Sequence, residues 1–263
     1  MLKRWINITR KKPAIIISLV LLLAVFVCII LFLVYKKLAP QVVPIKGKIA
    51  IVIDDWGYSL NNLRIVEEIK RPLTCAILPN LKNSRLVAQQ LHNYGFELIL
   101  HLPMEPREKI RLEKDTITTT MNAEQIRSIL DQGLGSILFA KGVSNHMGSR
   151  ITADRRVSAL IMSEAKSRKL YFLDSFVTAK SVCPSLAKKI KLRFAKRDVF
   201  LDNRDDPAYI KAQIMKLKDL AKKNGQAIGI GHDRKNTLIV LKEIIPQLVK
   251  SGYKLVFVSE IAK

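Results

Sequence analysis

From residue 48 onward, short apolar runs alternate with stretches in which apolar residues recur every three or four positions. The runs predict eight strands, at residues 48–53, 73–78, 96–100, 142–145, 170–173, 198–201, 227–230 and 254–258. The stretches between them predict helices at residues 60–69, 84–94, 123–130, 153–168, 207–223 and 237–250. Nearly continuous apolar strands suit a sheet that is buried on both faces. The alternation therefore predicts a parallel α/β sheet, either open or closed as a barrel.

Two places interrupt this alternation. Residues 103–121 form a long polar connection, and long connections at strand ends are often functional. Pro246 lies inside the helix predicted at residues 237–250, where it should bend the helix or mark a tight turn.

Before the alternating region lies an uncharged apolar segment at residues 14–35, AIIISLVLLLAVFVCIILFLVY. Its length is enough to span a bilayer as a helix. The basic residues before it are expected to stay in the cytoplasm, so the rest of the chain is expected outside it. A cleaved signal peptide is the alternative, but its apolar region is usually shorter and a small-x-small cleavage site should follow. The sequence thus predicts a cytoplasmic tail at 1–12, a transmembrane anchor at 13–35, a linker at 36–47 and one domain at 48–263.

Charge adds a second expectation about partners. The chain has 45 Lys and Arg residues against 22 Asp and Glu residues, a net charge of +23. Only seven of the basic residues flank the apolar segment, so the domain itself is strongly basic. Such a field favours anionic envelope polymers or lipid headgroups, and no nucleic-acid partner is expected. The alternative is a lysine-rich surface that is merely well solvated.

Residues able to carry chemistry follow the predicted strands. In β/α folds the carboxyl ends of the strands meet at one face, where active sites lie. Three of the four histidines and several carboxylates stand at such ends: Asp54, Asp55, His101, His146, Asp174, Asp202 and His232. One such residue alone is more simply explained as a helix cap or a structural histidine. Gathered at one rim, they predict a divalent cation held by two imidazoles and one carboxylate, with a position open for water.

The motifs resemble a known family, the divergent polysaccharide deacetylases, which are distant relatives of the nodulation-protein-type deacetylases. The resemblance covers residues 48–261. It is carried in order by IVIDDWG at 51–57, HLPMEP at 101–106, NHMGSR at 145–150, FLDS at 172–175, RDVFLDN at 197–203, IGH at 230–232 and GYKLVFVSE at 252–260.

This resemblance implies a distorted (β/α)7–8 barrel of the glycoside hydrolase/deacetylase type. It also implies metal-assisted hydrolysis of N- or O-acetyl groups on an envelope glycan, with zinc as the expected metal. Asp54 would be the base that takes a proton from water, and Asp55 and His101 would bind the metal. His232 would protonate the leaving group, and Asp174 would orient a site residue or cap a helix.

One position departs from the family pattern. The second histidine of the family motif is expected four residues after His101, where this chain has Glu105. Either Glu105 replaces it or His146, from the next strand, completes the site; His146 is favoured because it keeps an ordinary zinc ligand set.

Two other functions remain open. A glycoside hydrolase could use paired carboxylates such as Asp54 and Asp202, although it would not need three histidines. A non-catalytic envelope module could keep the barrel and bind wall glycan or a partner protein through its basic surface.

Overall fold

The computed structural model describes residues 3–38 and 44–263, which form two compact units that divide between Pro44 and Ile45. Each unit is described by itself. Residues 1–2 and 39–43, which belong to the predicted basic tail and linker, lie outside the described residues.

The first unit contains one helix, α1 (Lys3–Leu38). Within it, Ile16–Lys36 form a 21-residue segment with a mean hydropathy of 3.5 and no buried residues. The segment is long and apolar enough to cross a membrane, although a signal sequence near an N-terminus would have the same properties.

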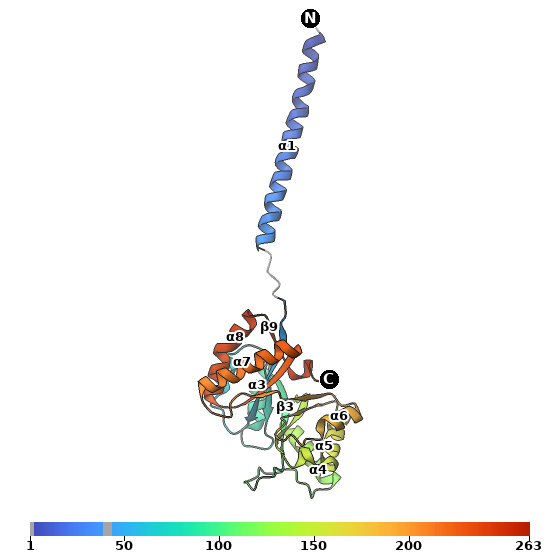
Figure 1. Ribbon diagram of the computed structural model, residues 1–263, viewed down its shortest axis with the longest axis vertical. Helices are drawn as coiled ribbons and strands as arrows, with labels where there is room; N and C mark the ends of the chain where they lie inside the picture. The colour runs from blue at the N-terminus through green and yellow to red at the C-terminus, as the bar shows by residue number, and fades with distance from the viewer. Residues whose placement is uncertain (1–2, 39–43) are drawn as a thin grey trace. The chain divides into compact units, whose positions relative to one another are not determined.

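The second unit is built on a parallel sheet (Figure 1). Its strands are β1 (Gly47–Trp56), β2 (Thr74–Ile77), β3 (Glu97–Met104), β4 (Gly142–Met147), β5 (Tyr171–Asp174), β6 (Phe194–Lys196), β7 (Val199–Phe200), β8 (Gln226–His232) and β9 (Tyr253–Val256). They are ordered β6-β5-β4-β3-β2-β1-β8-β7, and β9 pairs with the first residues of β1. Every strand pair is parallel, as the continuous apolar runs predicted.

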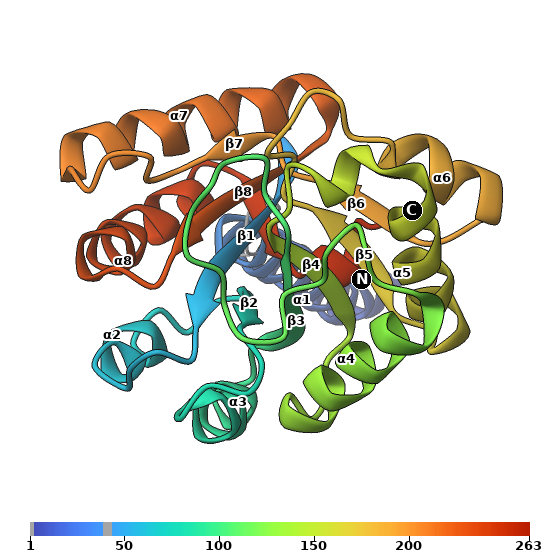
Figure 2. The same ribbon diagram turned by 90° about the horizontal axis from the view of Figure 1, so that it is seen from below.

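The sheet curls into an incomplete barrel. Its two ends, β6 and β7, follow each other in the sequence but are not paired within the part of the chain that the structure describes. Figure 2 shows the helices arranged around this curled sheet. The distorted barrel expected from the sequence is therefore confirmed.

The helices of this unit are α2 (Leu63–Glu67), α3 (Ser84–Asn93), α4 (Ala123–Ser136), α5 (Arg155–Ser167), α6 (Cys183–Ile190), α7 (Pro207–Asn224) and α8 (Lys235–Lys250). The sequence did not predict α6, a short helix, or β6, a three-residue strand that ends in the exposed Lys196. Helix α8 continues through Pro246 to Lys250 without a turn at the proline.

Alternate residues of the strands enter two separate cores. In β1, Ile49, Ile51 and Ile53 face the layer between sheet and helices, whereas Ala50 and Val52 face the interior of the curled sheet. Strand side chains alternate between faces, which explains this division. A residue two positions beyond the last inner residue, at the carboxyl end of a strand, is therefore directed into the mouth of the barrel.

The end of β9 and the segment after it fill the interior at the opposite end. Val256, Val258 and Ile261 belong to the inner core, and the Val258 amide donates to Thr74 Oγ1 at 3.1 Å. Phe194, at the start of β6, exchanges two backbone hydrogen bonds with Lys263. The amino end of the barrel is thus closed by the chain itself, and its carboxyl end carries the polar residues.

Candidate metal centre and active site

Strand alternation brings polar side chains from distant parts of the sequence to the carboxyl mouth of the barrel. Asp54 follows the inner residue Val52 by two positions, and His232 follows the inner residue Ile230 by two. Asp54 and His232 are also direct register partners across β1 and β8. His101 follows the inner residue Ile99 in the same way, so all three side chains face one space.

A backbone irregularity in β1 adds Asp55 to this group. Regular alternation would direct Asp54 and Asp55 to opposite faces of the sheet. However, Asp55 has a φ of 65°, and the pairing of β1 with β2 shifts register between Ile53 and Trp56. Asp is among the residues that tolerate this left-handed conformation. As a result, both carboxylates approach His101, whose Nε2 lies 3.6 Å from Asp54 Oδ2 and 3.2 Å from Asp55 Oδ1.

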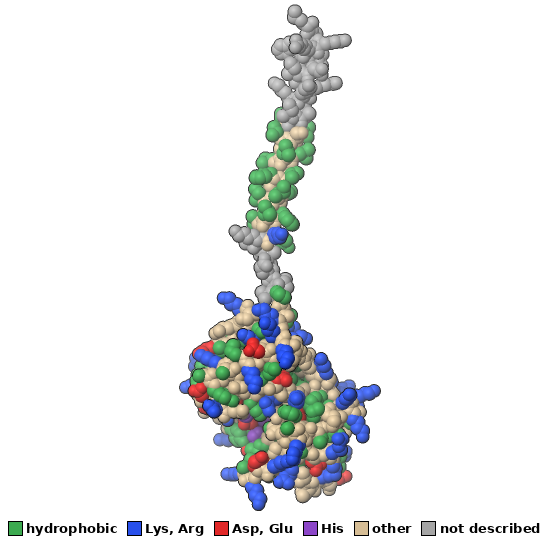
Figure 3. All heavy atoms as spheres, viewed as in Figure 1, with side chains coloured by type: hydrophobic (Ala, Val, Ile, Leu, Met, Phe, Trp, Pro, Cys, Tyr) green, Lys and Arg blue, Asp and Glu red, His purple; other side chains and the backbone are tan. Residues whose placement is uncertain are grey.

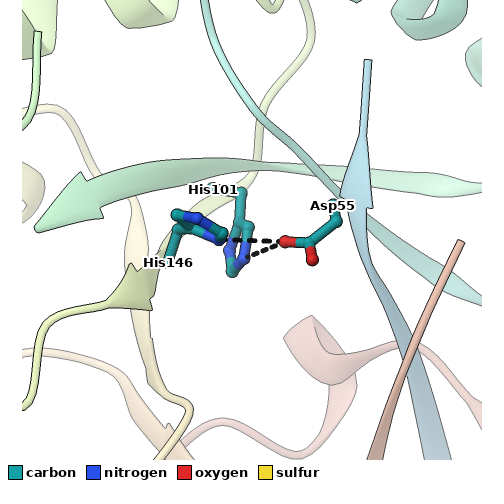
Figure 4. Close-up of side chains that lie close together, drawn as sticks. All are labelled: Asp55, His101 and His146. Atoms are coloured by element: carbon teal, nitrogen blue, oxygen red, sulfur yellow. Dashed lines mark hydrogen bonds and ion pairs between the residues drawn. The ribbon is translucent and has the colours of Figure 1, made fainter. Parts of the chain in front are cut away.

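Asp55, His101 and His146 converge closely enough to hold one metal ion (Figure 4). Their ligand atoms all lie within 4.8 Å of one another. Asp55 Oδ1 is 2.9 Å from His146 Nδ1 as well as 3.2 Å from His101 Nε2. His101 is buried, and only 11% of the His146 side chain is exposed.

The surroundings of these residues fit a transition metal such as zinc. Two imidazole nitrogens and one carboxylate oxygen form a usual zinc ligand set that leaves a position open. The other ring nitrogen of His101, Nδ1, lies 2.8 Å from Ser144 Oγ, which fixes the orientation of the ring. In the described part of the chain, the buried atoms Asp54 Oδ1 and His146 Nε2 have no hydrogen-bond partner. A buried polar atom without a partner is costly in a protein alone, and a water on a bound ion would give the Asp54 carboxylate the partner that it lacks.

Glu105, the alternative to His146, is bound elsewhere. Its Oε1 pairs with Arg150 Nε at 3.1 Å, and its Oε2 accepts hydrogen bonds from the amide and hydroxyl of Thr119. These contacts tie the long connection after β3 to the segment after β4. The geometry therefore brings His146, and not Glu105, to Asp55 and His101.

His232 is oriented by Asp202, a relationship that the sequence did not indicate. Asp202 Oδ1 lies 2.7 Å from His232 Nδ1, while its Oδ2 accepts from the His232 amide and the Thr237 hydroxyl. The ring of Phe200 stacks on His232 with centroids 6.1 Å apart, and the Arg197 guanidinium covers Phe200 at 3.6 Å. Asp202 was recognised as a strand-end residue, but only the fold shows that it contacts this histidine.

Asp174 has a different environment from the other strand-end residues. Its carboxylate is buried, and it accepts hydrogen bonds from the Phe176 amide at 2.8 Å and from the Ser181 hydroxyl at 2.6 Å. These contacts order the turn after β5, where Phe176 adopts a φ of 49°. The carboxylate orders a turn and does not cap a helix, because α6 begins only at Cys183 with Val182 at its N-cap. Its role in orienting a site residue stays a prediction.

Burial and neighbouring charges in the mouth of the barrel raise the pKa values of Asp54 and His232 and lower the pKa of Asp55. Burial raises the pKa of Asp54. Burial alone would also raise the pKa of Asp55, but the hydrogen bonds from His101 and His146 outweigh it and hold that pKa below its usual value. For His232, burial opposes protonation, yet the hydrogen bond to Asp202 and the nearby carboxylates raise its pKa above the ordinary value. Two neighbouring carboxylates and a histidine thus have distinct proton affinities, as acid–base chemistry requires.

Known proteins resemble this chain in sequence. An uncharacterized protein of Escherichia coli K12, YibQ, is 36% identical over 202 residues, which are 77% of this chain and 63% of the relative. The chain therefore matches less than two thirds of the length of that relative.

Solved structures resemble it in fold. The uncharacterized protein ATU2773 of Agrobacterium tumefaciens superposes with a TM-score of 0.78 at 25% identity, over 82% of this chain and 89% of that one. A family 4 carbohydrate esterase pseudoenzyme of Bacillus anthracis has a TM-score of 0.53 at 15% identity, over 84% and 66% of the two chains. A family 4 carbohydrate esterase of Streptomyces lividans, solved with acetate, also has a TM-score of 0.53 at 15% identity, over 80% and 91%.

The last two likenesses concern the fold, which this chain shares with both an esterase and a pseudoenzyme. Membership of a family is shown by the sequence comparison. The family model for divergent polysaccharide deacetylases matches residues 51–262, which include all the residues of the candidate site. The chain belongs to the divergent polysaccharide deacetylase family.

Proposed function

We propose that this protein is a metal-dependent deacetylase that removes acetyl groups from an envelope glycan. The observation that carries the proposal is the convergence of Asp55, His101 and His146 within 4.8 Å, with Asp54 and His232 as register partners beside them. Such an arrangement combines a cation site with separate groups for two proton transfers.

In this proposal Asp55, His101 and His146 hold a divalent metal, with zinc the best match to the ligand set. The cation would polarise the acetyl carbonyl and lower the pKa of a water molecule. Asp54, whose carboxylate is buried against His101, would take the proton of the attacking water. His232 would donate a proton to the leaving amine or alcohol, and Asp202 would keep its ring oriented and protonated. Asp54 and His232 lie on neighbouring strands, so a substrate could contact both.

The substrate class and the location rest on further support. The family acts on acetylated polysaccharides, and the related Streptomyces lividans esterase was solved with acetate, the product of such a reaction. The apolar segment Ile16–Lys36 and the basic residues before it support an uncleaved, single-pass anchor with a cytoplasmic N-terminus. The domain would then work outside the cytoplasm, where envelope glycans lie.

A non-catalytic envelope module is the second candidate. It is favoured by one observation, which is that the fold is shared with a pseudoenzyme of Bacillus anthracis. Such a module would bind wall glycan, an acidic polymer or a partner protein through its basic surface. Fold alone does not separate the two candidates, because function depends on the site.

The test uses the full chain purified in detergent. Its metal content is measured by elemental analysis, and acetate release is then measured with N-acetylated chito-oligosaccharides and acetylated xylan as probes. We expect one bound transition metal and acetate release that a chelator abolishes and zinc restores. His232→Asn should keep the metal and lose about 10²- to 10⁴-fold in rate. The matched control Asp219→Asn, on the exposed face of α7, should change neither the metal content nor the rate of acetate release. A metal-free protein that releases no acetate would favour the module instead.

A further inference from the structure

Basic side chains mark the amino ends of the strands, at the face opposite the site. Lys46 and Lys141 directly precede β1 and β4, Arg193 directly precedes β6, and Lys169 lies two residues before β5. All four side chains are exposed, and none makes an ion pair within the described residues. Because the strands are parallel, their amino ends share one face of the barrel. We call this the amino-end face.

An exposed apolar turn lies on the same face. Leu138 and Phe139, between α4 and β4, leave 52% and 50% of their surfaces exposed. Phe139 has a φ of 71°, a left-handed conformation that is rare for a bulky aromatic residue. The Phe139 ring lies outside the core, where it stacks on the exposed ring of His92 with centroids 4.0 Å apart. Exposed aromatic and apolar side chains beside cations are typical of surfaces that insert into the headgroup layer of a membrane.

A cavity adjoins this turn. It has a volume of about 520 Å³ and is lined by the rings of Phe96, Phe139 and Phe257 and by three of the four cations, Lys141, Lys169 and Arg193. Glu97 also lines it, but its Oε1 accepts hydrogen bonds from Thr74, Tyr171 and Ser259. Arg168 also lines it but is paired with Glu164 and Asp131. A hollow with cations at its rim and apolar walls suits an amphipathic anion, such as the phosphate headgroup and upper acyl chain of a phospholipid.

The anchor of the proposed function is joined to the globular unit just before β1. Residue 45, the first of the globular unit, precedes β1 at the amino end of the sheet. The attachment point therefore lies at the same end of the strands as the four cations. Figure 3 shows Lys and Arg side chains spread over one side of the globular unit, and the chain has a net charge of +23, so a lipid surface of negative charge would attract it.

We propose that the amino-end face docks on the anionic phospholipid headgroups of the membrane, with Leu138 and Phe139 inserted among them. The proposal rests on the anchor in the proposed function, but not on its catalytic part. Docking holds the carboxyl mouth of the barrel away from the bilayer, toward the glycan. An acidic partner protein on the same face is the competing occupant.

The test compares full-length protein in nanodiscs of phosphatidylcholine alone and of phosphatidylcholine with phosphatidylglycerol. Amide hydrogen exchange is followed by mass spectrometry. We expect slower exchange in residues 136–142 and 168–171 only when phosphatidylglycerol is present, and we expect high salt to reverse it. Exchange in residues 105–115, in the connection at the carboxyl mouth, should be the same in both lipids. Equal exchange of the amino-end face in both nanodiscs would overturn the proposal and leave the face to a protein partner.

Variants separate docking from anchoring and from misfolding. Phe139→Gly removes the apolar ring and suits the left-handed backbone, so the fold should persist while the lipid-dependent protection is lost. Lys141→Glu combined with Lys169→Glu should also abolish the lipid-dependent protection from exchange. Lys109→Glu, at an equally exposed position of the connection after β3, should leave it unchanged. Co-elution with nanodiscs reports the anchor independently: a chain that fails to incorporate disproves the anchor, whereas one that incorporates without protection disproves the docking.

Discussion

His232 Nδ1 lies 2.7 Å from the buried carboxylate of Asp202, which also accepts a hydrogen bond from the His232 amide. The contact occupies Nδ1 and leaves Nε2 as the ring nitrogen available to a substrate. It also stabilises the protonated ring, because the charge is balanced by a carboxylate with little exposure to water. Since β7 and β8 carry the two residues to each other, the pair depends on the fold and not on closeness in sequence.

This pair predicts a pH dependence. The pKa of His232 is raised above its ordinary value of 6.5, so the acid form that donates the proton persists above that pH, and activity should fall as pH rises through the raised pKa. Asp202→Asn removes the charge and should move the high-pH limb of the kcat profile to lower pH, with a rate loss of about 10²-fold even at its optimum. The measurement is acetate release across pH with metal in excess. An unshifted limb in this variant would mean that His232 is not the acid.

The metal ligands predict a second result. His101→Ala should weaken metal binding by more than about 100-fold, because it removes a ligand and not merely a supporting contact. His92→Ala is the matched control, since His92 is the one histidine away from the barrel mouth and is exposed on α3. Elemental analysis after dialysis against a chelator buffer distinguishes them. Equal metal content in the two variants would exclude His101 as a ligand.

Substitution of Ser144 should have a smaller effect on metal binding than substitution of His101. Its hydroxyl lies 2.8 Å from His101 Nδ1 and is fully buried. Ser144→Ala leaves all three ligands in place but frees the ring, so metal affinity should fall by about 10- to 100-fold. Competition with a chromogenic chelator measures this change. Ser149→Ala, whose hydroxyl instead contacts Arg107 and Glu108, should bind metal as the parent does.

Asp174 predicts a change in stability. The carboxylate accepts hydrogen bonds from the Phe176 amide and the Ser181 hydroxyl, and it is fully buried. Asp174→Ala should lower the free energy of unfolding by about 1–3 kcal/mol for each group left unpaired. Metal content should remain that of the parent, since none of these contacts involves Asp55, His101 or His146. Denaturant unfolding and elemental analysis test the two parts; a loss of metal in a folded variant would return Asp174 to the site.

The fold was largely predictable from the hydrophobic pattern, because its strands are buried on both faces and read as continuous apolar runs. The strand and the strand end that the sequence failed to predict lack such an apolar run. Strand β6 has only Phe194, Ala195 and Lys196, and its pairing with β5 is what makes it a strand. Strand β3 continues past its predicted end at Leu100 to Met104, because the polar residue His101 faces the mouth while Leu102 faces the helices.

The candidate site was predictable in its residues but not in its contacts. Strand-end position and residue type selected a group of seven residues. The resemblance to the family singled out Asp55 and His101 as ligands, and the usual zinc ligand set favoured His146 over Glu105; these roles remain predictions. The register shift that turns Asp55 inward depends on pairing with β2, and no local pattern signals it. Likewise, Asp202 reaches His232 only because Phe200 pairs with Ile230, so a contact between residues 30 apart comes from sheet register.

The way the interior is filled has a consequence for biosynthesis. Val256, Val258 and Ile261 complete a core whose other members begin at Ala50, so contacts are missing from that core until more than two hundred residues have been synthesised. Until β9 and the segment after it have been made, the inner layer lacks these three side chains. The domain should therefore reach its final packing only after β9 has been synthesised.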